Sequence, residues 1–182
     1  HGFNRLGGNS VAETVVAGMI VGEFIADFCD KAENGIDIPT SLIYGALAKE
    51  EARLKSFMNN GGSENAYEIR TRMQEIMTTK IGIFRKGADM ESAVAELEEL
   101  YKRSFKVSVK DVVGPNPELI YAYRTQKMLR VALSVAYGAL NRKESRGAHY
   151  REDFPVRNDI EWLNRTIATW KEGDTLPTLN YE

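Results

Sequence analysis

The chain has 182 residues, a length that fits one domain, or one domain with part of another, around a core of moderate size. Its 43% hydrophobic and 27% charged residues are ordinary for a globular protein, and a net charge of −2 gives no electrostatic basis for binding nucleic acid or an anionic membrane surface. The one cysteine, Cys29, excludes an internal disulfide and a CxxC metal motif, and it fits a reducing, cytoplasmic setting.

The first predicted element is a helix over residues 11–30. Ser10 and Glu13 form the Ser-x-x-Glu pattern of a capping box at its start. Apolar residues lie on nearly all sides of this helix, which is typical of a helix buried inside a larger fold. The acidic residues Glu13, Glu23 and Asp27 argue against a transmembrane span.

Two glycines in this helix, Gly18 and Gly22, lie one turn apart and favour the close approach of another backbone. A loop at Asn34-Gly35 separates the helix from a second predicted helix over residues 40–58. The clearest linker in the chain, Asn59-Asn60-Gly61-Gly62, follows that second helix.

After the linker the pattern changes to long amphipathic helices, predicted over residues 64–79, 90–104 and 118–142. Apolar residues recur at helical spacing in each of them. Gly82 and Gly87 flank the break after the first helix, and Gly114-Pro115-Asn116-Pro117 is a strong turn before the third. Residues 64–142 therefore predict three antiparallel helices that pack as a small bundle.

The C-terminal residues are predicted to form a short helix over residues 159–170 and a short strand over residues 178–181, where polar and apolar residues alternate. Trp162 and Trp170 are expected to cover the bundle rather than to stack on a ligand. No internal repeat or low-complexity segment is visible in the sequence.

The first segment that could carry chemistry is HGFNRLGGNS, residues 1–10. Gly7 and Gly8 permit a close approach of the backbone, and the following helix start brings unpaired N–H groups and a positive dipole end beside the loop. Such a site suits an anion, or a ring carbonyl that gains negative charge on reduction, and Arg5 could grip a carboxylate. A Gly-Gly turn with a surface arginine explains the same residues and stays open as an alternative.

The second such segment is ESRGAHYRED, residues 144–153, which places Arg146, His149 and Arg151 among three acidic residues. One interpretation is an ion-pair network that fixes this loop against a neighbouring domain. The other is an acid/base site in which His149 titrates. One histidine among arginines favours the structural interpretation.

The remaining features carry less chemical information. Lys102-Arg103 and Arg142-Lys143 are cations at helix ends, which the helix macrodipole explains. The sequence has no GxGxxG, no P-loop, no Ser/His/Asp order and no cluster of metal ligands, so no metal site is predicted. The Gly-rich run opens the chain without a preceding strand, which leads us to expect an excised segment of a longer protein.

The two segments resemble the signatures of a known family. Residues 1–10 are similar to the HGxNRLGGNS signature of the succinate dehydrogenase/fumarate reductase flavoproteins, and residues 144–155 resemble that family's ESRGAHxREDYP signature, with Phe154 where tyrosine is usual. The spacing between the signatures and the tail over residues 157–179 also match. Phe3 and Val11 look most like the fumarate reductase branch of menaquinol-linked bacterial respiration.

The resemblance implies a role for several residues. Arg5 would bind a carboxylate of fumarate or succinate, and Asn9, Ser10 and Val11 would contact the isoalloxazine ring of FAD. Arg146, His149 and Arg151, in the second signature, would help to seat the helical domain on the flavin domain. No catalytic residue is expected within this segment, and His149 is assigned no catalytic role.

The resemblance also implies a fold and a domain organisation. The chain would be mainly α. Residues 1–60 would form the C-terminal piece of the FAD-binding domain, with its buried helix. Residues 61–182 would form a C-terminal helical domain, in which residues 64–142 make a spectrin-repeat-like three-helix bundle and residues 143–182 make the signature loop and tail.

The function implied is that of a flavoprotein subunit that interconverts fumarate and succinate by hydride transfer with FAD. Its partners would be an iron–sulfur subunit and membrane quinone-binding subunits, and it would lie on the cytoplasmic side of the inner membrane as a peripheral protein. The family's dinucleotide fingerprint, flavin-attaching histidine and proton-donating arginine all lie N-terminal to such a segment. The segment alone is therefore expected to be inactive and to bind neither flavin nor fumarate.

Other interpretations of the sequence stay open. A sister flavoenzyme, either succinate dehydrogenase or L-aspartate oxidase, shares much of both signatures. A self-standing helical interaction module would explain residues 64–142 without any chemistry. The working direction of the enzyme depends on the potentials of flavin and quinone, and the sequence does not set it. The nearly all-apolar helix 11–29 predicts oligomerisation or rearrangement if nothing shelters it.

Overall fold

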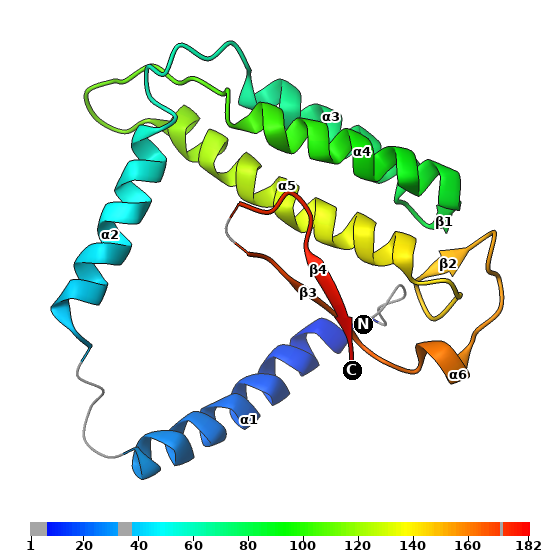
Figure 1. Ribbon diagram of the computed structural model, residues 1–182. Coiled ribbons are helices and arrows are strands. Elements are labelled where there is room, and N and C mark those ends of the chain that lie inside the picture. Colours follow the sequence, from blue (N-terminus) through cyan, green and yellow to red (C-terminus); the bar gives the residue numbers. More distant parts are fainter. Residues whose placement is uncertain (1–6, 33–37, 172) are drawn as a thin grey trace. The chain divides into compact units, whose positions relative to one another are not determined.

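The computed structural model describes residues 7–32, 38–171 and 173–182 (Figure 1). The chain divides into two compact units, His1–Ala48 and Lys49–Glu182. This division falls before the predicted domain boundary at residues 60/61, and the assignment of residues 1–60 to a flavin-binding domain stays a prediction. The described elements are mainly helical, which confirms the predicted fold class.

The first unit contains α1, Asn9–Lys31, and most of α2, Thr40–Lys55. Gly8 is the N-cap of α1 and adopts a left-handed conformation with φ 82°. Its carbonyl oxygen accepts hydrogen bonds from the N–H groups of Val11 and Ala12, both at 3.1 Å. The predicted capping box at Ser10 is therefore wrong, because the turn at Gly8 starts the helix two residues earlier and places Ser10 inside it.

No residue of α1 is buried, although the sequence predicted a buried helix. Phe24, for example, is 73% exposed, and Phe28 and Met19 are similarly open. A Cβ added at Gly18 or Gly22 would meet no atom within 4 Å, so within the first unit no backbone packs closely on these glycines. The sulfur of Cys29 is a free thiol on this exposed helix.

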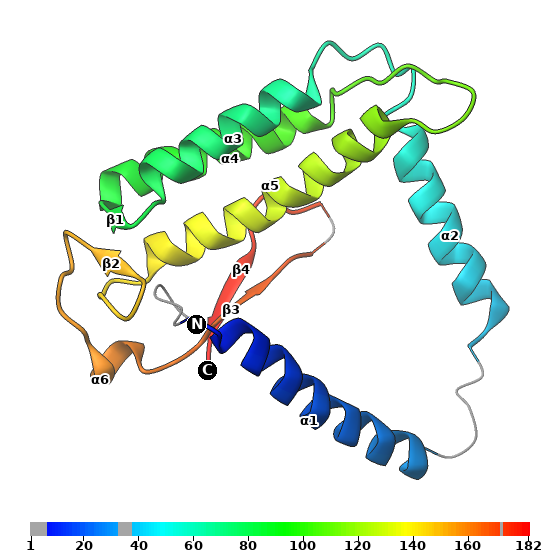
Figure 2. The ribbon, with the colours of Figure 1, turned by 180° about the vertical axis from the view of Figure 1, so that it is seen from behind.

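The second unit is built around α3 (Ala66–Lys80), α4 (Gly87–Ser104) and α5 (Pro117–Asn141), which lie side by side, with consecutive helices running in opposite directions (Figures 1 and 2). Each helix contacts the other two. Asparagine side chains cap α3 and α5 by accepting hydrogen bonds from first-turn N–H groups. The comparison with a spectrin repeat stays a prediction.

The apolar positions that recur at helical spacing point into one core between these three helices. Burial of such side chains is the main contribution to the stability of this unit. The most deeply buried members of the core are Ile69, Ile76, Met90, Ala93, Leu97, Leu129, Leu133 and Ala136.

The linker after α2 is held against the loop that follows α4. The Asn59 N–H donates to the Val109 carbonyl at 3.1 Å, and the Asn60 side-chain amide donates to the Val107 carbonyl at 2.9 Å. A Cβ added at Gly62 would lie 2.0 Å from the carbonyl oxygen of Lys106. The glycine is therefore required by close packing of two backbones.

Four short strands form two separate pairs among the described residues. β1 (Phe84–Arg85) pairs in parallel with β2 (Tyr150–Arg151), and β3 (Thr166–Thr169) pairs antiparallel with β4 (Thr178–Tyr181). The strand expected over residues 178–181 is thus confirmed.

The helix expected over residues 159–170 is wrong beyond α6, Asp159–Trp162. The residues after it form β3, where β-branched Thr166, Ile167 and Thr169 suit an extended backbone. The hydrogen bonds of these residues go to β4, a partner that a local sequence window does not contain.

The two tryptophans have different positions. Trp170 packs against the core, donates to the Ser134 hydroxyl at 2.9 Å, and lies under the Arg130 guanidinium at 4.6 Å. Trp162 instead contacts Arg142 and, edge to face, Tyr181. The expectation that both tryptophans cover the bundle therefore holds for Trp170. None of the helices within the described ranges is long and apolar enough to cross a membrane.

Candidate functional site

The first candidate site lies at the N-terminus of α1. Asn9, Ser10 and Val11 form the first turn of the helix, where the backbone N–H groups and the macrodipole create positive potential. Gly7 and Gly8 leave open space on the side where a Cβ would stand. This set of donors fits an anion or a polar ring edge that gains negative charge. Arg5, the predicted substrate-binding residue, lies outside the described residues.

The second candidate site is the signature loop, residues 144–155, and its centre is Glu144. This carboxylate is 0% exposed. One oxygen accepts from Arg142 Nη1 at 2.6 Å and Arg146 Nε at 2.8 Å. The other accepts from Arg146 Nη2 at 3.1 Å and the Asn158 N–H at 2.9 Å. The hydrogen bonds from Arg146, the Asn158 N–H and Arg142 lower the pKa of Glu144 to about 2 despite its burial.

The same arginines connect the end of α5 with the tail of the chain. Arg146 donates to Asp159 at 2.5 Å, and Arg142 donates to the Asn164 carbonyl at 2.7 Å. Hydrogen bonds from Arg157 and Arg146 lower the pKa of Asp159 to about 2. The position of Arg142 at a helix end had suggested an interaction with the helix macrodipole alone. In the structure Arg142 also forms hydrogen bonds with Glu144 and Asn164.

Arg151 closes the C-terminal end of α5. Its side chain is 2% exposed, and its Nη1 donates to the carbonyl oxygens of Ala139, Leu140 and Arg142 at 3.1, 2.8 and 3.2 Å. Its Nε and Nη2 form a bidentate pair with Asp153 at 2.8 and 2.7 Å. The guanidinium thus satisfies helix-end carbonyls while its charge is balanced.

His149 is hydrogen-bonded through both ring nitrogens. Arg85 Nη1 lies 2.7 Å from Nδ1, and the Arg142 carbonyl lies 3.2 Å from Nε2. Burial lowers the pKa of His149, the hydrogen bond to the Arg142 carbonyl raises it in part, and the charges of Arg85, Arg151 and Arg142 lower it, so the net direction is downward. An imidazole that is neutral and hydrogen-bonded at both nitrogens favours the structural interpretation of this motif over the acid/base one.

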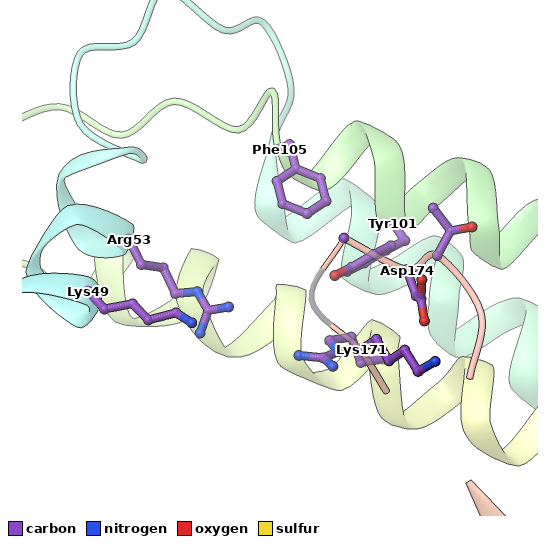
Figure 3. A pocket seen from close by; sticks show the side chains of 9 residues that line it. Lys49, Arg53, Tyr101, Phe105, Lys171 and Asp174 are labelled. Carbon is purple, nitrogen blue, oxygen red and sulfur yellow. The ribbon is translucent and has the colours of Figure 1, made fainter. Parts of the chain in front are cut away.

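A separate pocket of about 370 Å³ lies elsewhere in the second unit. In Figure 3, Lys49 and Arg53 extend from α2 toward the segment that carries Lys171 and Asp174, and Tyr101 forms part of the wall. The lining carries more cationic than acidic side chains, with Asp174 as its one carboxylate, and these residues lie outside both signature segments. No group of histidine, cysteine and carboxylate side chains suited to a metal ion occurs among the residues described.

Comparison with known proteins assigns the chain to a family. Residues 70–182 match the family described as "Fumarate reductase flavoprotein C-term". The chain belongs to this family.

Relatives and solved structures agree with the family. The chain is 50% identical to the fumarate reductase flavoprotein subunit of Helicobacter pylori, over 100% of this chain and 26% of that subunit. It is 33% identical to the succinate dehydrogenase flavoprotein subunit of Bacillus subtilis, over 100% of this chain and 31% of that subunit. A structure of Escherichia coli quinol fumarate reductase matches with a TM-score of 0.85 and 36% identity, over 98% of this chain and 30% of that one. The chain thus corresponds to the C-terminal part of these flavoprotein subunits and spans less than a third of their length.

Several residues of the site in this flavoprotein segment were not predicted from the sequence. Arg85 is 64 positions before His149, and no local pattern links them. Asn158 and Asp159 contribute a backbone N–H and a carboxylate from beyond the signature. Arg142 lies two residues before Glu144. This short spacing between opposite charges was the signal in the sequence from which their ion pair could have been predicted.

Proposed function

We propose that the chain is the C-terminal part of the catalytic flavoprotein subunit of a fumarate reductase, an oxidoreductase that interconverts fumarate and succinate in quinol-linked anaerobic respiration. The observation that carries this proposal is the 50% identity to a fumarate reductase subunit along the whole chain. The identity to the succinate dehydrogenase subunit is lower, 33%, which makes that enzyme the second candidate.

The start of α1 would form one wall of the flavin site. Asn9, Ser10 and Val11 present the positive end of the helix, which would favour a reduced, anionic ring beside it. FAD, when bound in the complete subunit, supplies hydride transfer to or from the dicarboxylate. Arg5 would hold a substrate carboxylate close to that ring with its planar guanidinium.

The signature loop would act as a rigid connection between the helical unit and the flavin domain. Arg146 and Arg151 are fixed by paired carboxylates, and His149 is fixed by two hydrogen bonds. Exposed apolar side chains next to them, such as Val156 and Ile160, would pack on the neighbouring domain. The role of this motif is therefore to position, and no proton-transfer step is assigned to it.

The complete enzyme would work as a membrane-bound complex. One similar solved structure is a quinol–fumarate reductase with menaquinol molecules. We infer an iron–sulfur subunit and membrane quinone-binding subunits as partners of the full-length flavoprotein, which would lie on the cytoplasmic face of the inner membrane. The potentials of flavin and quinone would decide whether fumarate reduction or succinate oxidation predominates.

The proposal is tested with the full-length subunit and its Arg5→Ala variant, assayed for fumarate reduction by a reduced dye. We expect kcat/KM to fall by an amount equivalent to about 3 kcal/mol or more, with flavin content unchanged, because a substrate carboxylate loses its ion pair. Arg124→Ala on the exposed side of α5 is the matched control and should keep full activity. Full activity in the Arg5 variant would show that this residue does not bind the substrate.

Two further assays separate the alternatives. Oxidation of succinate and of L-aspartate by the full-length subunit distinguishes the present proposal from an aspartate oxidase. A visible flavin spectrum on the purified 182-residue chain would contradict the expectation that this segment alone binds no FAD.

A further inference from the structure

The turn that joins α3 to α4, residues 81–86, is held to the signature loop through the side chain of Arg85. The Arg85 Nε donates to the carbonyl oxygens of Ile81 and Gly82 at 3.1 and 3.0 Å. These two residues follow the C-terminus of α3 directly. The Arg85 Nη1 reaches His149 Nδ1 at 2.7 Å. One guanidinium thus organises the turn and contacts the loop at the same time.

This contact requires a particular form of the imidazole ring. A guanidinium group has donors and no acceptor, so Nδ1 of His149 must accept the hydrogen bond and cannot carry a proton. The second nitrogen, Nε2, then carries the ring proton and donates it to the Arg142 carbonyl at 3.2 Å. His149 therefore joins the turn to the end of α5 only as the neutral, Nε2-protonated tautomer.

We propose that His149 is a protonation-sensitive latch, which holds the α3–α4 turn against the signature loop when neutral and releases it when protonated. A proton on Nδ1 would point at an N–H group of Arg85, so the hydrogen bond would become a contact between two donors. The same proton would add a positive charge next to a second positive charge. Both effects separate Arg85 from the ring.

The charges around the ring act in the same direction. Arg85 from β1, Arg142 from the end of α5 and Arg151 from β2 all face the imidazole, and their charges disfavour its protonated form. Two carboxylates of the signature loop are engaged elsewhere, because Glu144 binds Arg142 and Asp153 binds Arg151. Protonated His149 would thus have cations as its neighbours and no carboxylate hydrogen-bonded to it among the contacts of the described residues.

The backbone supplies a reporter for the latch. β1 and β2 pair over two residues, and beyond them the Glu152 N–H donates to the Arg85 carbonyl at 2.9 Å. Lys86 and Glu152 add an exposed ion pair at 3.3 Å, which is worth little on its own. Release of the Arg85 side chain should therefore open this pairing and expose the Glu152 amide to exchange.

The test is an NMR titration of the whole chain between pH 8 and pH 5. The chain has two histidines, His1 and His149, so the ring signals are assigned by comparison with His149→Gln. At pH 8 we expect His149 to be the neutral Nε2-protonated tautomer. The pKa of its ring should lie below the ordinary value for histidine. As the ring titrates, the protection factor of the Glu152 amide, corrected for intrinsic exchange, should fall by about tenfold or more, since a charge-assisted hydrogen bond is lost.

The matched control uses a side chain that keeps both hydrogen bonds but cannot titrate. In His149→Gln the amide oxygen can accept from Arg85 and the amide nitrogen can donate to the Arg142 carbonyl, so Glu152 protection should stay constant with pH. The Asn59 amide, which donates to Val109 at a distant loop, serves as an internal reference. Titration at or above the ordinary value, unchanged Glu152 protection, or an equal loss in the glutamine variant would overturn the latch.

Discussion

Glu144 and Glu75 show how much the surroundings of a carboxylate change its contribution to the stability of the fold. Both accept a hydrogen bond from arginine, but Glu144 is fully buried, with two arginines and a backbone N–H as donors. Glu75 meets Arg72 at 3.1 Å on the surface, where the two side chains are 56% and 51% exposed. Solvent screens the exposed pair, whereas removal of one partner from a buried cluster leaves charge without compensation.

Glu144→Gln should therefore destabilise the chain strongly. The amide removes the negative charge that balances Arg142 and Arg146, and we expect the free energy of unfolding to fall by about 3 kcal/mol or more. Urea denaturation followed by circular dichroism measures this change. Glu75→Gln is the control, with an expected change of about 0–1 kcal/mol. Equal effects of the two substitutions would mean that the Glu144 cluster is not the connection described above.

The pH dependence of stability follows from the same carboxylates. The pKa values of Glu144 and Asp159 are about 2 in the folded chain, below the ordinary values of 4.5 and 3.8. Since the folded state holds these groups ionised, their stabilisation is present above the ordinary values and is lost as pH falls toward 2. Thermal melts of Glu144→Gln should accordingly depend less on pH in this acidic window than those of the unaltered chain.

At the scale of elements, periodicity and end signals predicted the long helices well. The structure starts α3, α4 and α5 within a few residues of the predicted positions, because their apolar stripes face a shared core. Prediction was wrong where the deciding partner is distant, as in β3, whose hydrogen bonds go to β4. Arg85 was missed for the same reason, whereas the composition of the signature loop alone predicted an ion-pair network.

Substitution by alanine should change the stability of the chain in opposite directions at two glycines of the second unit. Gly138 lies inside α5 with no atom within 4 Å of an added Cβ, so Gly138→Ala should stabilise the chain by about 0.5–1 kcal/mol through the helix preference of alanine. Gly62→Ala would place a methyl group 2.0 Å from the Lys106 carbonyl and must displace the linker.

We expect Gly62→Ala to cost about 1–3 kcal/mol, the usual range for a backbone forced out of place. Thermal melts of the two variants, measured together under one condition, check both signs. A gain in stability on Gly62→Ala would show that the linker does not pack tightly against the loop after α4.

At the scale of the whole molecule, we expect the apolar surface of the first unit to control association in solution. The helical residues of α1 expose large side chains on several faces, among them Val15, Met19, Phe24, Ile25 and Phe28. Exposure of this many large apolar side chains on one helix is typical of an interface. The sequence predicted a sheltered helix here, whereas no residue of α1 is buried within the first unit.

The 182-residue chain should therefore self-associate in dilute buffer. Replacing Phe24 and Phe28 together by lysine should shift the sedimentation coefficient toward that of a monomer, because two charges interrupt the apolar surface. Val131→Lys, at an exposed position of α5, is the control and should leave association unchanged. A monomeric unaltered chain at all concentrations tested would contradict this prediction.

The exposed thiol on α1 has a practical consequence. Because Cys29 is the one cysteine of the chain, a maleimide dye attaches at a single defined position, one residue from Phe28. Alkylation should be fast on the monomeric chain, where the thiol is open to solvent, and slow wherever self-association or another domain covers this helix. The rate of labelling at Cys29 thus reports whether α1 is covered. This measurement needs neither bound flavin nor enzyme turnover.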